Sequence, residues 1–181
     1  MTSFRNDLQS YRDSGAASLK ADLPRLVRAA IDDSQVTGGF RYFVADVCMD
    51  LKEFHSAIQV LQTQDRLVGL SDVGFNNLGY CYWELEDHES AYRAFANSLA
   101  INSDNVSSAR GATFCATVTG RNAEARDWGK QFYERSGKSE QAALWYATAL
   151  FNADERKSLD ALLMDRASEF GDEPFLREFK S

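Results

Sequence analysis

Proline and long apolar runs are both scarce in this sequence. The chain has only two prolines among its 181 residues, Pro24 and Pro174. Because proline interrupts helices and central strands, its scarcity favours long helices. No apolar run approaches the roughly 20 residues that a membrane-spanning helix needs. The first segment, MTSFRNDLQSYRDSG, has neither the apolar core of a secretory signal nor a cysteine for lipid attachment, so we expect no membrane association.

Cysteine is also scarce. Cys48, Cys81 and Cys115 form an odd set without a CxxC pair. This pattern argues against a disulfide framework and against a zinc site. Free cysteine behaves as a small apolar side chain, so we expect buried thiols, a reducing environment and a cytoplasmic protein.

Positive charge is in deficit. The chain has 20 Lys and Arg against 27 Asp and Glu, which gives a formal net charge of −7. A surface of this sign repels nucleic-acid phosphates and anionic membranes, so we expect neither as a partner. It favours a protein or peptide partner with basic character.

Motifs for catalysis are missing too. Gly38 and Gly39 lack the further glycines and the lysine of a phosphate-binding loop, and no nucleophile motif is present. His55 and His88 are predicted to lie on exposed turns, where solvated side chains are expected rather than metal ligands. We therefore expect no enzyme, no cofactor and no metal site.

The sequence does contain an internal period. Small residues recur every 34 residues at Ala45, Gly79, Thr113 and Ala147. A second set with the same spacing is Ala57, Ala91 and Ala125, followed by Leu159. Two helices of about 14 residues with two turns fill such a period, and small residues let the helix axes cross closely. Each unit is thus predicted to be a helical hairpin that stacks on its neighbours to bury its apolar face.

A large side chain follows three of the four members of the second set, four positions later. These residues are Leu61, Phe95 and Leu163, but the third unit has Gly129 at this position. Two alternatives remain for that unit: Trp128 and Phe132 fill the gap, or the helix bends.

The register divides the chain into three parts. Residues 1–37 form an N-terminal helical cap or dimerisation arm, and residues 174–181 form a C-terminal tail. Between them lie four predicted repeats, 38–71, 72–105, 106–139 and 140–173.

The two flanking parts are expected to be helical. In the first, Phe4, Leu8 and Tyr11 predict one short helix, and a second helix is predicted to begin near Asp22 and Pro24. This part is expected to cap the stack, to dimerise or to fold back into the groove. In the tail, a last short helix over the exposed end is predicted from Phe175, Leu176 and Phe179.

The second unit, residues 72–105, carries the most complete pattern. Its packing positions hold Phe75, Leu78, Gly79, Tyr82, Ala91 and Phe95. This pattern resembles a tetratricopeptide repeat. The resemblance implies an all-α, right-handed α-solenoid of stacked helix-turn-helix hairpins with N-terminal capping helices, which serves protein–protein interaction. In fold and size, the chain is also similar to the chaperones that bind translocator proteins of type III secretion systems.

In this architecture the first helix of every hairpin lines a concave groove. The predicted groove residues are Tyr42, Asp46, Met49, Asn76, Asn77, Tyr80, Trp83, Arg110, Phe114 and Phe151. Many of them are aromatic or apolar, and exposed apolar patches usually mark an interaction site. The alternative is that these aromatic side chains belong to the core or are covered by the N-terminal helices.

One subclass of the family holds acidic chaperone tails with a clamp of lysine, arginine and asparagine. At the matching positions of this chain, only Asn77 agrees. We therefore expect the groove to bind an apolar and basic peptide or helix, so that the protein acts as an adaptor, a chaperone or an assembly factor. The alternative is a self-associating scaffold, for example a homodimer, whose groove is occupied by its own N-terminal or C-terminal segment.

Overall fold

The computed structural model describes residues 16–170, 177 and 179. Within residues 16–170 there are nine helices and no strand, so the all-α prediction is confirmed. The helices are α2 (Ala16–Asp32), α3 (Gly38–Asp50), α4 (Phe54–Val68), α5 (Asp72–Glu84), α6 (His88–Ile101), α7 (Val106–Val118), α8 (Asn122–Arg135), α9 (Glu140–Asn152) and α10 (Arg156–Phe170). The helix predicted from Phe4, Leu8 and Tyr11 lies outside the described residues, as do Phe175 and Leu176.

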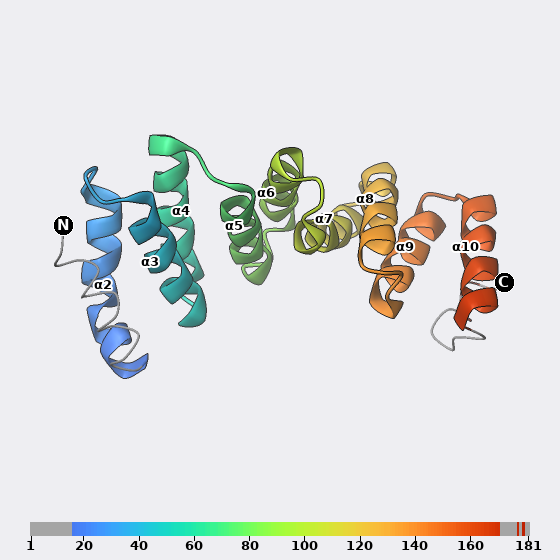
Figure 1. Cartoon of the computed structure of the whole chain (residues 1–181), viewed down its shortest axis with the longest axis horizontal. Coiled ribbons are helices and arrows are strands. Elements are labelled where there is room, and N and C mark those ends of the chain that lie inside the picture. The colour runs from blue at the N-terminus through green and yellow to red at the C-terminus, as the bar shows by residue number, and fades with distance from the viewer. Residues whose placement is uncertain (1–15, 171–176, 178, 180–181) are drawn as a thin grey trace. The chain divides into compact units, whose positions relative to one another are not determined.

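The chain divides into two compact units, Met1–Leu70 and Ser71–Ser181. Unit 1 contains α2 to α4, and unit 2 contains α5 to α10 (Figure 1). In unit 1, α2 packs against both α3 and α4. In unit 2, the helices of a hairpin pack on each other, and α5, α7 and α9 also contact one another in succession. The finer division into a cap, four repeats and a tail stays a prediction.

The start of each first helix is fixed by a capping side chain. Side-chain oxygens of these caps accept hydrogen bonds from the third backbone N–H of the helix. The caps are Thr37, Ser71, Asn105 and Ser139, at oxygen–nitrogen distances of 3.3, 3.1, 3.1 and 3.4 Å. Such caps satisfy backbone N–H groups that the helix itself leaves unpaired. The caps stand 34 residues apart, as the repeats do, so the sequence itself marks where these helices begin.

The end of each first helix is a left-handed turn. The residues with positive φ are Lys52, Glu86, Gly120 and Asp154, at 60°, 60°, 72° and 57°. The backbone N–H of the residue after each of them donates a hydrogen bond to a carbonyl oxygen of the helix. Asp87 N, for example, donates to Tyr82 O at 3.0 Å. This bond closes the Schellman motif, which normally has glycine at the left-handed position. Only the third of these turns has that glycine.

Replacing Glu86 with glycine is expected to raise the free energy of unfolding by about 0.5–1 kcal/mol. Its φ of 60° strains a residue with a Cβ, and its side chain is exposed, so no packing is lost. Urea unfolding measures the change. The reverse replacement, Gly120→Ala, serves as the control and should destabilise, and an equal effect of both changes would contradict this explanation.

Helix α2 begins earlier than the sequence predicts. It starts at Ala16 and runs through Pro24, so the predicted start near Asp22 and Pro24 is wrong. Proline removes only one backbone hydrogen bond, and burial of Leu23 and Leu26 stabilises the helix on both sides of it. Packing of the amphipathic face therefore outweighs the local stop signal.

Arg41 on α3 is a buried arginine that holds the end of α2. Its side chain is 1% exposed. The guanidinium donates to the carbonyl oxygens of Ala30, Val36 and Asp33, each at 2.9 Å. These carbonyls belong to the last turn of α2 and to the connection that follows it. One side chain thus satisfies three acceptors and fixes the path from α2 to α3.

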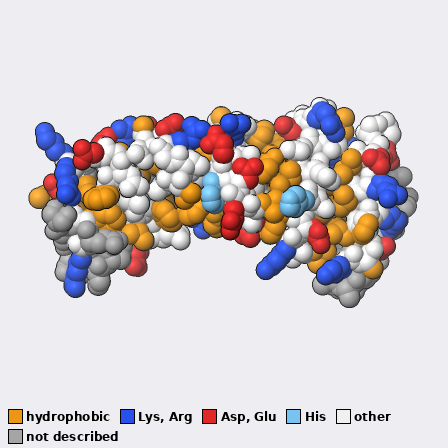
Figure 2. Space-filling model, turned by 180° about the vertical axis from the view of Figure 1, so that it is seen from behind, with side chains coloured by type: hydrophobic (Ala, Val, Ile, Leu, Met, Phe, Trp, Pro, Cys, Tyr) orange, Lys and Arg blue, Asp and Glu red, His pale blue; other side chains and the backbone are white. Residues whose placement is uncertain are grey.

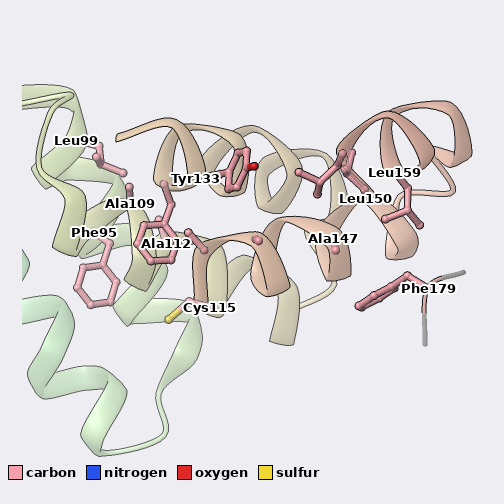
Figure 3. Packing of buried hydrophobic residues seen from close by; sticks show 14 of the residues in the cluster. Phe95, Leu99, Ala109, Ala112, Cys115, Tyr133, Ala147, Leu150, Leu159 and Phe179 are labelled. Carbon is pink, nitrogen blue, oxygen red and sulfur yellow. The ribbon is translucent and has the colours of Figure 1, made fainter. Parts of the chain in front are cut away.

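A large cluster of buried side chains in unit 2 extends from α6 to α10 and includes Phe179 (Figure 3), and Ala116, Ala125 and Ala149 form a smaller one. Near the start of the large cluster, the ring of Phe95 on α6 fills the space between two glycines. A Cβ at Gly79 on α5 would lie 2.7 Å from this ring, and a Cβ at Gly111 on α7 would lie 2.5 Å from it. Both distances are shorter than van der Waals contact, so the ring needs glycine on both sides.

The space at Gly129 is filled from the next hairpin. Helix α8 runs from Asn122 to Arg135 as one element. A Cβ at Gly129 would lie 3.3 Å from the Cα of Tyr146 and 3.3 Å from Cγ2 of Thr113. Phe132 is buried as expected, but it is Tyr146 on α9 that approaches the glycine. In the predicted repeat 106–139, the Thr113 side chain and the Tyr146 backbone thus lie against the position where the other repeats have a large side chain.

Candidate partner-binding surface

Four aromatic side chains form a row across the first helices of unit 2. We call Tyr80, Trp83, Phe114 and Trp145 the aromatic row. The ring centroids are 6.0 Å apart for Tyr80 and Trp83, 5.6 Å for Trp83 and Phe114, and 5.2 Å for Phe114 and Trp145. Each pair is arranged edge to face, which the charge distribution of aromatic rings favours. The rings come from α5, α7 and α9, so the row links three successive hairpins.

The α5 end of the row is accessible to solvent. Tyr80 is 37% exposed and Trp83 is 36% exposed, so the alternative that these two side chains are core residues is wrong. Phe114 and Trp145 are half-buried and support them. Figure 2 shows several groups of hydrophobic side chains that reach the surface beside acidic and basic ones. Exposed aromatic side chains held in a fixed arrangement are typical of binding surfaces.

His88 lies against the row instead of in solvent. Its ring centroid is 5.6 Å from that of Phe114, and the planes meet at 75°. The residue is half-buried, and its Nδ1 is buried without a hydrogen-bond partner in the described part of the chain. The prediction of a solvated histidine is therefore wrong, because the first turn of α6 packs toward α7.

Asn76 and Asn77 are both half-buried. The side-chain oxygen of Asn76 accepts a hydrogen bond from Ser108 Oγ at 2.9 Å. Ser108 Oγ also lies 2.7 Å from Ser98 Oγ, which in turn donates to the Asp72 carbonyl at 2.8 Å. Asn76 thus helps to join α5 to α7, so its oxygen is already engaged.

The remaining predicted groove residues are spread over both units. Arg110 is exposed on α7, one turn before Phe114. Phe151 is 52% exposed and contacts Phe179, with ring centroids 6.0 Å apart. On α3 of unit 1, Asp46 is exposed, whereas Tyr42 and Met49 are half-buried. A role of these residues in binding stays a prediction.

Glu84, the last residue of α5, stands beside Tyr80. A hydrogen bond to this carboxylate raises the pKa of the Tyr80 phenol, and burial raises it further. The phenol is therefore protonated at neutral pH and donates to Glu84. This pair adds a negative charge to the exposed end of the aromatic row.

The thiols are not part of this surface. Cys48, Cys81 and Cys115 are buried, as predicted, and none of them forms a disulfide. Burial raises the pKa of Cys48 and of Cys115 to about 12, so both are protonated at neutral pH. In the described residues, no group of three or more His, Cys, Asp and Glu side chains is placed to hold a metal ion. Nor does this part of the chain contain a helix with the length and apolarity to span a membrane.

The helical hairpins of unit 2, with their shared core, define an all-α helical-repeat protein. Residues 74–105 match the family described as Tetratricopeptide repeat. No curated protein matches the chain.

Several solved structures have the same fold. YrrB, "a TPR protein with an unusual peptide-binding site", is similar at 16% identity and a TM-score of 0.69, over 91% of this chain and 88% of YrrB. MamA is similar at 13% identity and a TM-score of 0.67, over 93% of this chain and 98% of MamA. The pilF protein of Pseudomonas aeruginosa is similar at 16% identity and a TM-score of 0.62, over 91% of this chain and 79% of pilF. The chain therefore has the tetratricopeptide-repeat fold, and its sequence contains one recognisable tetratricopeptide repeat.

Proposed function

We propose that the chain is a non-enzymatic protein-binding module that holds a peptide or helix of a partner against the aromatic row. One observation supports this most: Tyr80 and Trp83 are exposed but held in fixed contact with each other. Such side chains bind a partner with little loss of conformational entropy. The fold agrees, because it is also the fold of YrrB, whose description names a peptide-binding site.

The expected partner segment is apolar with basic character. Apolar side chains would cover the aromatic row, and the formal net charge of −7 favours a positively charged segment over nucleic acid or an anionic membrane. We infer a role as an adaptor, a chaperone or an assembly factor. The three buried cysteines, which form no disulfide, support a reducing compartment, the cytoplasm.

The test is to purify partners from the source cells with the wild-type chain and to measure their affinity for variants by calorimetry. Replacing Trp83 with alanine is expected to weaken binding about 30-fold, which corresponds to the roughly 2 kcal/mol of an interface hot spot. Met164→Ala is the matched control, because Met164 on α10 is 73% exposed and lies outside the row. Equal affinity of wild type and Trp83→Ala, with the helical circular dichroism unchanged, would rule out the proposal.

A further inference from the structure

The end of the aromatic row at Glu84 carries an unpaired negative charge. Several other carboxylates of unit 2 are paired with basic side chains. These pairs are Glu89 with Arg121 at 2.6 Å, Asp104 with Arg135 at 3.1 Å and Glu169 with Lys138 at 2.7 Å. Among the described residues, Glu84 has no basic partner, although it is exposed. The charge is therefore available to a ligand.

In the part of the chain that the structure describes, no cation lies above the ring of Trp83 either. The cation–π contacts between described residues are those of Arg121 with Tyr92, at 4.9 Å, and of Arg166 with Tyr133, at 5.9 Å. Tryptophan binds cations more strongly than these tyrosines do. Arginine side chains thus cover the rings of Tyr92 and Tyr133, whereas no described arginine or lysine covers Trp83, which binds cations more strongly.

The helix end adds to the negative potential at this place. Helix α5 ends at Glu84, where its last carbonyl groups carry partial negative charge. Glu86 follows in the turn and is also exposed. Tyr80 contacts Trp83 and donates a hydrogen bond to Glu84, because residues three and four positions apart share one face of a helix. Tyr80 therefore contacts both an exposed aromatic ring and an exposed carboxylate at the C-terminal end of α5, and we call Tyr80, Trp83 and Glu84 the corner.

We propose that this corner, formed by Tyr80, Trp83 and Glu84, receives an arginine side chain of the bound segment. This inference rests on the proposed function and specifies the partner. A guanidinium is planar, so it stacks on an indole ring while it donates two hydrogen bonds to a carboxylate. Lysine supplies the charge without the planar stack and binds this corner less tightly. Tyr80 acts as a positioning residue that holds the Glu84 carboxylate.

The test uses short random peptides displayed on phage and selected on the full chain. The selected peptides are expected to be enriched in arginine relative to the starting library. The tightest peptide is then synthesised with arginine and with citrulline, which has nearly the same shape but no charge. Glu84→Gln is expected to weaken the arginine peptide about tenfold and to leave the citrulline peptide unchanged. Glutamine keeps an oxygen that accepts the Tyr80 hydrogen bond, so the site retains its shape.

Glu134→Gln on α8 is the control for net charge. Glu134 is exposed and its pair with Lys130 is long, at 3.9 Å, so this change should leave both affinities unchanged. Equal binding of the arginine peptide to wild type and Glu84→Gln overturns the inference, and the proposed function survives if Trp83→Ala still weakens the same peptide. If no selected peptide needs Trp83 for binding, the inference and the proposed function both fail.

Discussion

Replacing Phe95 with alanine is expected to lower the free energy of unfolding by about 3–5 kcal/mol. The ring is 3% exposed and lies between α5 and α7. Both neighbouring positions, Gly79 and Gly111, lack a side chain that is able to move into the cavity. The surrounding helices therefore cannot fill the space without a shift of the backbone. Equilibrium urea unfolding, followed by circular dichroism, measures the loss.

A substitution at Gly111 tests whether its contact with the Phe95 ring causes this loss of stability. In the wild type, Gly111→Ala is expected to cost about 1–3 kcal/mol, because the added methyl group collides with the ring. In the Phe95→Ala background, the same change should stabilise the chain by up to about 1 kcal/mol, because alanine favours the helix and the cavity accepts it. Gly79→Ala should behave in the same way. A cost that is equal in both backgrounds would contradict this packing.

Replacing Arg41 with methionine is expected to lower the free energy of unfolding of unit 1 by about 3 kcal/mol, because three carbonyl oxygens lose their hydrogen bond to the guanidinium. Methionine fills a similar volume, so the effect reports hydrogen bonding more than packing. The Ala30 carbonyl lies in the buried part of this contact and is the most costly to leave unpaired. Hydrogen exchange of the α2 amides measures the loss and should be faster in the variant.

Arg28→Met is the matched control for Arg41. Arg28 is exposed on α2, so its replacement should change stability by about 0.5 kcal/mol or less. Arg41→Lys provides a milder variant if the methionine variant does not fold. A single ammonium group cannot reach three separate carbonyls, so exchange should still be faster than in the wild type. Wild-type exchange in both Arg41 variants would show that this arginine does not hold α2.

The helical hairpins followed from local signals in the sequence. The polar caps Ser71 and Asn105 stand 34 residues apart, as do the left-handed residues Glu86 and Gly120. The caps act on hydrogen bonds within a few residues, so they can be recognised without knowledge of the fold, whereas the turn at Glu86 lacks the glycine that marks a left-handed position. The start of α2 was missed for the converse reason: contacts with α3 and α4 outweigh the local effect of Pro24.

Only part of the candidate site followed from the same register. Tyr80, Trp83 and Phe114 were predicted from their position on first helices, and the structure places them in one row. Trp145 was missed because the residue of its helix that was predicted to line the groove is Phe151. His88 was missed because it belongs to a second helix, and a period along the chain does not report which side chains meet across hairpins.

The sequence by itself determined the helical hairpins and their capped starts, because these depend on neighbours within one or two helical turns. Only the tertiary structure decided which side chains meet between hairpins. The ring of Phe95 reaches Gly111 in the next hairpin, and Tyr146 closes the space at Gly129. Such contacts depend on how closely helix axes approach, a distance that the sum of all packing contacts determines. The open corner at Trp83 and Glu84 has the same origin, since it exists where the packed helices leave a ring and a charge uncovered.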